Sequence, residues 1–160
     1  MEKLMQVQEV FIEETFHASI ERVFNAWTDP GKLLQWYAPA GCTIRFKTLN
    51  IVTGGKFHSC ISNPVHGDCW CIGEYLEVQP YIRIVFTLIN ADENGQPINP
   101  TTIGMDADWP GETVVTVTFS EVEKGITRLQ LKQSVSQDLA KKTGAYPSWL
   151  QMLEKMRGVV

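Results

Sequence analysis

From residue 43 to residue 135 the sequence alternates between strand-like segments and turn residues, and this order restricts the fold more than any other feature. Gly, Pro, Asn or Asp stand in the connections, as in Thr53-Gly54-Gly55 and Gln79-Pro80-Tyr81. Because short connections join antiparallel neighbours, we predict one antiparallel sheet. Its six segments combine β-branched and aromatic residues over 43–51, 56–62, 69–78, 82–89, 113–122 and 126–135.

The residues before this run predict a seventh strand and two short helices. Residues 7–16 form a half-buried strand with Val10, Ile12 and Phe16 on one face, which Glu14 shares. Two helices follow, the first capped by Ser19 and the second begun by Asp29-Pro30. The apolar stripe of the first helix consists of Ile20, Val23, Phe24 and Trp27, and that of the second of Pro30, Leu33, Leu34 and Tyr37.

The C-terminal residues predict a single substantial helix. It begins near Pro147, and its apolar face is made of Trp149, Met152, Leu153, Met156 and Val160. A sheet that buries one face against one helix has to bend around it. We therefore predict an α+β fold in which a curved antiparallel sheet of about seven strands wraps around the C-terminal helix, leaving a cavity where the helix does not reach.

Length, charge and hydropathy exclude several classes of protein. A chain of 160 residues fits one domain, which we assign to residues 1–160. With a net charge of −4 and no cluster of Lys and Arg, a nucleic-acid partner is not expected. Apolar stretches such as 84–89 are too short to cross a bilayer, and the N-terminus lacks the apolar region of a signal peptide. We expect a cytoplasmic protein with no membrane partner.

Four cysteines are predicted to be free thiols. If residues 63–68 form a hairpin that pairs Ser62 with Cys69, then Cys60 lies opposite Cys71 on the outer face of the sheet, with His58 nearby. Zinc binding by this group is the alternative, but structural zinc sites favour C-x₂₋₄-C knuckles in loops. We therefore predict no metal, and the absence of a phosphate-binding or dinucleotide motif predicts no cofactor.

The segment from Asn90 to Gly111 has no periodicity and contains three prolines and three glycines. A structureless loop of this length in a compact domain is usually functional or disordered. Met105 and Trp109 make it a candidate lid, and a mobile surface loop is the alternative.

Several segments together resemble a known family. They are AWTDP, QWYAP, TGGKF, GEYLEVQPYIRIVFT and VTVTFSEVEKGITRLQL, followed by the late tryptophan helix. In this order they resemble the SRPBCC or START-like helix-grip superfamily, in the branch of homologues of the activator of the heat-shock-protein-90 ATPase. The resemblance covers residues 7–156 and implies a deep apolar cavity under the C-terminal helix that holds a hydrophobic small molecule.

The leading hypothesis is a binding protein for an apolar or aromatic small molecule. Strand parity puts Glu74 on one face with Trp70, Ile72 and Leu76, so we expect a carboxylate inside the cavity. Val23, Phe24 and Trp27 are expected in the core. The predicted lining is Trp36, Tyr37, Phe57, Trp70, Glu74, Phe86, Trp109, Trp149, Met152 and Leu153.

Two alternatives stay open. The first is a cyclase, isomerase or hydrolase that uses Glu74 or Glu14 as acid or base, with Tyr75 as a further catalytic candidate. His17, a lone histidine where strand becomes helix, is interpreted as a turn residue. The second is a chaperone-linked interaction module, suggested only by the name of the branch. A homodimer is also possible, for example through the 90–111 loop.

Overall fold

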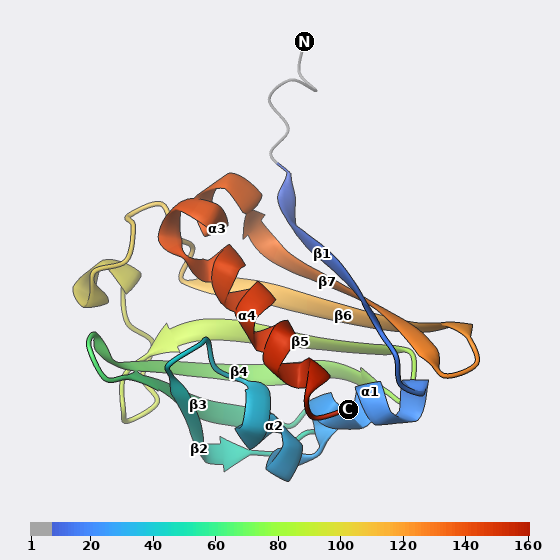
Figure 1. The fold of residues 1–160 in the computed structure, drawn as a ribbon. Coiled ribbons are helices and arrows are strands. Elements are labelled where there is room, and N and C mark those ends of the chain that lie inside the picture. Colours follow the sequence, from blue (N-terminus) through green and yellow to red (C-terminus); the bar gives the residue numbers. More distant parts are fainter. Residues whose placement is uncertain (1–7) are drawn as a thin grey trace.

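The computed structural model describes residues 8–160, which form seven strands, four helices and one 3₁₀ turn (Figure 1). The strands are β1 (Glu9–Phe16), β2 (Thr43–Leu49), β3 (Lys56–Asn63), β4 (Gly67–Gln79), β5 (Arg83–Ala91), β6 (Glu112–Glu123) and β7 (Ile126–Ser136). The helices are α1 (Ile20–Thr28), α2 (Pro30–Trp36), α3 (Gln137–Thr143) and α4 (Ala145–Arg157), and the 3₁₀ turn is Pro100–Ile103. Within residues 8–160 no helix has the length and apolar character that a membrane span requires.

All seven strands belong to one antiparallel sheet in the order β1-β7-β6-β5-β4-β3-β2. Helix α4 runs across one face of this sheet, and α1 and α2 lie beside it at one end (Figure 1). The ring of Phe24 in α1 packs 5.2 Å from that of Phe119 in β6, and the ring of Trp27 lies 6.4 Å from that of Trp149 in α4. The predicted α+β helix-grip architecture is confirmed.

The face of the sheet toward the helices carries the hydrophobic core. Along most of β6 and β7 every second residue is buried there, because side chains alternate between the two faces of a strand. The buried strand residues include Val10, Ile12, Phe16, Ile84, Phe86, Val115, Val117, Phe119, Leu129, Leu131 and Val135. Val23, Phe24 and Trp27 belong to the same core, as predicted from their spacing.

The helix starts follow the predicted capping residues. The Ser19 hydroxyl accepts a hydrogen bond from the backbone N–H of Arg22 at 3.3 Å, and the Asp29 carboxylate accepts one from that of Gly31 at 2.8 Å. Helix α3 was not predicted, because a seven-residue helix in which only Ala140 is buried shows no apolar period. It ends at Gly144, whose φ of 92° lets the chain turn directly into α4.

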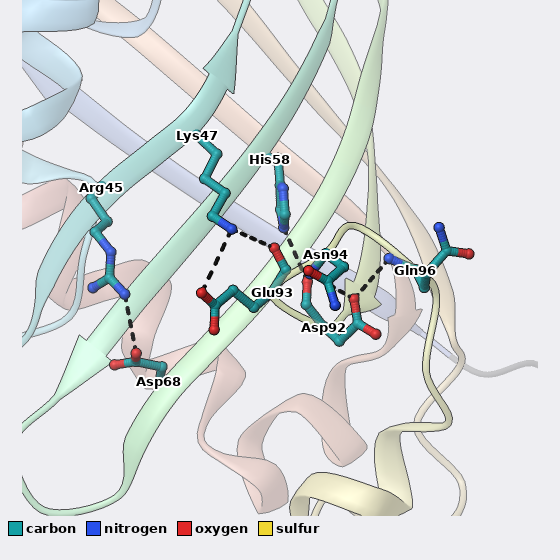
Figure 2. Close-up of polar contacts among 8 residues, drawn as sticks. All are labelled: Arg45, Lys47, His58, Asp68, Asp92, Glu93, Asn94 and Gln96. Atoms are coloured by element: carbon teal, nitrogen blue, oxygen red, sulfur yellow. Dashed lines mark hydrogen bonds and ion pairs between the residues drawn. The ribbon is translucent and has the colours of Figure 1, made fainter.

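The expectation that residues 90–111 lack structure is wrong. Ala91 forms an isolated bridge with Pro97, and the 3₁₀ turn follows. Two side chains of the face away from α4 hold the first part of this segment (Figure 2). The ammonium of Lys47 donates to the Glu93 carbonyl at 2.8 Å, and the imidazole Nε2 of His58 lies 3.0 Å from the Asp92 carbonyl oxygen. The segment is therefore a folded connection attached to the sheet.

Candidate functional site

A cavity of about 160 Å³ lies between the sheet and helix α4. Strands β3, β4, β5 and β7 contribute residues to its floor, α4 forms its roof, and Trp109 from the β5–β6 connection also lines it. The lining residues are Tyr37, Ser59, Ile61, Cys69, Cys71, Leu88, Trp109, Gln133, Ala145, Ser148, Trp149 and Met152. The cavity thus occupies the predicted place, between the curved sheet and the terminal helix.

Small side chains on two paired strands leave this space open. Ser59 of β3 pairs with Cys71 of β4, and Ile61 pairs with Cys69. Two pairs further along, on the same face of the sheet, Phe57 stands opposite Gly73, and the Phe57 ring belongs to the core. The cavity is therefore deeper above the Ser59–Cys71 pair than above Phe57.

A chain of hydrogen bonds fixes the tryptophan in the roof. The indole N–H of Trp149 donates to the side-chain oxygen of Gln133 at 2.9 Å, and the Gln133 amide nitrogen donates to the Thr113 hydroxyl at 3.0 Å. All three residues are buried, so leaving any of these groups unpaired would be costly. The indole therefore presents a fixed aromatic wall to the cavity.

The titratable side chains of the lining are one tyrosine and two cysteines. Burial raises the pKa of Tyr37 well above its usual value, so this phenol stays protonated. A hydrogen bond from Cys71 lowers the pKa of Cys69 to about 7, and the same bond together with burial raises the pKa of Cys71. The lining contains no Asp, Glu, Lys or Arg. Apart from the Cys69 thiolate, the walls carry no charge and suit a neutral ligand.

The second half of the β5–β6 connection covers the cavity. Trp109 lines the cavity and packs against the core, and its backbone N–H donates to the Asp106 carbonyl at 3.0 Å. The Asp106 carboxylate lies 3.0 Å from the ammonium of Lys142 in α3, and it also accepts a hydrogen bond from the backbone of Asp108. These contacts lower the pKa of Asp106. They also connect the covering segment to the helix beside the cavity.

Of the ten predicted lining residues, the structure brings four to the cavity: Tyr37, Trp109, Trp149 and Met152. Four others, Trp36, Phe57, Phe86 and Leu153, are buried in the core and do not line it. Trp36 is fully buried, and its indole N–H donates to the Ala26 carbonyl at 2.8 Å. The prediction that it lines the cavity mouth is wrong, because this bond draws the indole between α1 and α2.

Trp70 and Glu74 were predicted on the inner face of the sheet, and this is wrong. A β-bulge lies between Tyr75 and Glu77, and it reverses the alternation along β4. Val78 packs against the core on one side of the bulge, and Tyr75 does so on the other. The even-numbered residues before the bulge therefore face away from α4.

The outer face has a hollow of its own. A groove of about 670 Å³ runs over β3 to β6 on the side away from α4, and Glu74, Ile72 and His58 are among its lining residues. Trp70 lies further along this face, where the Arg45 guanidinium and the Lys47 ammonium each lie 5.1 Å from its ring centroid. Trp70 and Glu74 thus both lie on the outer face of the sheet.

The structure does not assemble the predicted acid–base pair. The Glu14 carboxylate lies 2.7 Å from the guanidinium of Arg157 in α4, and Glu74 lies on the other face of the sheet. Tyr75 is buried between the rings of Phe57 and Phe86, with centroid distances of 5.6 Å and 5.8 Å, and burial raises its pKa. None of the three catalytic candidates lines the cavity.

The predicted register of the β3–β4 hairpin is off by one residue. Ser62 pairs with Asp68 and Cys60 pairs with Trp70, because the connecting turn is one residue shorter than expected. Cys60 therefore faces outward, while Cys69 and Cys71 face the cavity, so the suggested cluster of three thiols and His58 does not form. All four cysteines are free thiols.

Sequence reasoning missed Cys69 and Cys71 as cavity residues, although Gly73 carried the signal. A Cβ atom built on Gly73 would overlap the Phe57 ring and the Thr87 carbonyl. A glycine inside a strand often marks such a close approach. Because Gly73 shares its face with Cys71 and Tyr75, reading it in this way would have turned both cysteines inward. The other missed lining residues are Ser59, Ile61, Leu88, Gln133, Ala145 and Ser148.

Solved structures share this fold. A protein from Arthrobacter aurescens superposes with a TM-score of 0.78 at 21% identity, over 96% of this chain and 90% of its own. A protein from Staphylococcus epidermidis gives 0.77 at 23% identity, with 96% and 90% covered. The AHSA1 protein from Silicibacter pomeroyi gives 0.74 at 21% identity, with 94% and 96% covered. These identities establish the fold alone.

No curated protein matches the sequence at a significant level. A family model, by contrast, matches residues 17–160, which include all four helices and six of the seven strands. The model is described as Activator of Hsp90 ATPase homolog 1-like protein. With nearly the whole chain covered and the helix-grip fold in place, the protein belongs to this family.

Proposed function

We propose that the chain acts as a single binding domain that holds a neutral, apolar small molecule between β3, β4 and α4. The observation that carries this proposal is a cavity with no Asp, Glu, Lys or Arg in its lining and with Trp109, Trp149 and Met152 in its walls. Aromatic and aliphatic walls with a few polar groups are typical of small-molecule sites. The SRPBCC resemblance supports the same function, and so does the family match.

The volume of the cavity limits the ligand. Ordinary ligand pockets measure about 300–1,000 Å³, whereas an engineered apolar cavity of about 150 Å³ takes up benzene. A cavity of about 160 Å³ therefore fits one aromatic ring. A larger ligand requires the segment carrying Trp109 to move outward, and the flexible side chain of Met152 can adapt to its shape.

Toluene titration tests the proposal, with tryptophan fluorescence and calorimetry as readouts. We expect saturable binding to the wild-type chain, because Trp109 and Trp149 line the cavity. Ala145→Leu fills the cavity from α4 and should weaken binding by at least about tenfold. Ala40→Leu, a matched change at an exposed position, should leave binding unchanged. Equal binding by the Ala145 variant, or no saturable binding at all, would refute the proposal.

The predictions of a homodimer and of a chaperone partner stay predictions, as does the cytoplasmic location. The description of the family names an activator of the Hsp90 ATPase. Sedimentation of the purified chain would test the dimer, and stimulation of a chaperone's ATP hydrolysis would test the partner.

A further inference from the structure

Two thiols stand side by side in the floor of the cavity. Cys69 and Cys71 lie two residues apart on β4, so their side chains leave the same face of the strand. Both line the cavity, and neither forms a disulfide. Residues two apart on a strand are separated by about 6.5–7 Å along it, a span that two cysteine side chains can bridge through one shared atom. Such a pair is a ready dithiol.

The rest of the cavity is suited to an apolar group attached to whatever the thiols hold. Trp109 and Trp149 provide aromatic walls, and Met152 contributes a thioether, a third soft sulfur atom. Soft sulfur ligands favour soft acceptor atoms over Mg²⁺, Ca²⁺ and other hard cations. The same walls offer no carboxylate that would attract a hard cation.

We propose that the cavity captures compounds in which a thiophilic centre, such as trivalent arsenic, carries an apolar group. Cys69 and Cys71 bind the centre as a dithiolate, and the aromatic walls take the apolar group. This inference rests on the proposed function, because it uses the same cavity, and it adds the chemical class of the ligand.

The reaction of phenylarsine oxide illustrates the chemistry. Each thiol gives up its proton, two arsenic–sulfur bonds form, and the arsenic–oxygen bond breaks. The oxygen leaves as water with both protons, and arsenic stays trivalent, so no oxidant or reductant is needed. The phenyl ring is of the size that a cavity of about 160 Å³ accommodates.

The test uses the full, reduced chain and compares phenylarsine oxide with arsenite, which has no apolar group. We expect phenylarsine oxide to remove two thiols from a thiol titration. Cys69→Ser and Cys71→Ser should each weaken binding by at least about a hundredfold, because a single sulfur loses the second, intramolecular bond. Cys42→Ser is the matched control and should bind like the wild type, since Cys42 lies outside the cavity. Arsenite should bind more weakly than phenylarsine oxide.

Three results would overturn the inference. The first is undiminished binding in a Cys69→Ser, Cys71→Ser double variant, and the second is an equal loss in Cys42→Ser. The third is arsenite binding as tight as that of phenylarsine oxide, which would remove the role of the aromatic walls. Toluene binding separates the two proposals: a chain that binds toluene but not phenylarsine oxide keeps the apolar cavity and loses the dithiol site. Toluene binding by the serine variants also shows that they are folded.

Discussion

The space between the sheet and the helices is filled at one end and hollow at the other. Near α1 and α2, the rings of Trp27 and Trp36 lie 4.7 Å apart and the hollow beside Phe57 and Phe86 measures only about 10 Å³. Near the start of α4 the cavity measures about 160 Å³. Both ends are lined by residues of β3, β4 and β5. Side-chain size on these strands, rather than the path of α4, therefore decides where a ligand fits.

Replacing a tryptophan should give the largest difference between the two ends in the free energy of unfolding. Trp36→Ala should lower the free energy of unfolding by about 3–5 kcal/mol, because it leaves a void in a packed core. Trp109→Ala should cost about 1–2 kcal/mol, because that indole is partly exposed and already borders empty space. Urea denaturation measures both values.

Trp36→Phe is the control for that comparison. It keeps most of the ring volume but loses the indole hydrogen bond to the Ala26 carbonyl, and we expect a loss of about 1–2 kcal/mol. Similar losses for Trp36→Ala and Trp109→Ala would show that the two ends are equally packed, and the comparison would fail.

An Ala→Leu substitution at each end should give the next largest difference in the free energy of unfolding. Ala26→Leu places extra atoms where α1 is fully buried and should destabilise the chain by about 1–3 kcal/mol. Ala145→Leu adds the same atoms at the cavity and should change the free energy of unfolding by less than about 1 kcal/mol. Thermal unfolding compares the two variants. A large loss in the Ala145 variant would mean that the cavity cannot accept added atoms.

The filled end was the easier one to predict from the sequence. Ser19, Asp29 and the stripe through Val23, Phe24 and Trp27 are local signals, because a cap or a helical period depends on neighbours in the chain. The structure confirms these helices and their buried face. The order of strands was likewise visible, since each short turn joins two neighbours.

The hollow end depends on information that is not local. A single β-bulge at Tyr75 reverses which residues of β4 face α4, and strand alternation alone does not show it. The apolar residues Ile72 and Leu76 face away from α4. Their hydrophobicity therefore led to a wrong prediction of which face of β4 points toward the cavity. Whether an indole fills the core or lines a cavity depends on three-dimensional packing. For this reason the sequence led to the same prediction for Trp36 and Trp109, that both line the cavity.

The hollow end should also differ in the reactivity of one thiol, Cys69. The pKa of Cys69 is lowered from 9.0 to about 7, so about half of this thiol is ionised at pH 7, compared with about 1% for an ordinary one. The rate of alkylation by iodoacetamide should rise about tenfold per pH unit below pH 7 and level off above it. Mass spectrometry of the labelled peptide follows the rate at each pH.

Cys71→Ser is the informative control for this titration. The serine keeps a hydroxyl beside Cys69 but removes the thiol that shares the bond, so the midpoint should move toward the ordinary value. If Cys69 of the wild-type chain fails to level near pH 7, the two thiols do not interact as described.

The smallest effect is expected where the covering segment meets α3. Asp106→Asn removes the charge of the ion pair with Lys142 but keeps an oxygen that can accept from the Asp108 backbone. Exposed ion pairs contribute little to stability. The rate of amide hydrogen exchange around Trp109 should therefore rise by only about two- to fivefold, with no change near Trp36. Asp108→Asn is the matched control, since it changes the neighbouring charge and leaves the Asp106–Lys142 pair intact. An equal rise in both variants would show that this pair does not hold the cover, and a rise near Trp36 would mean that the two ends open together.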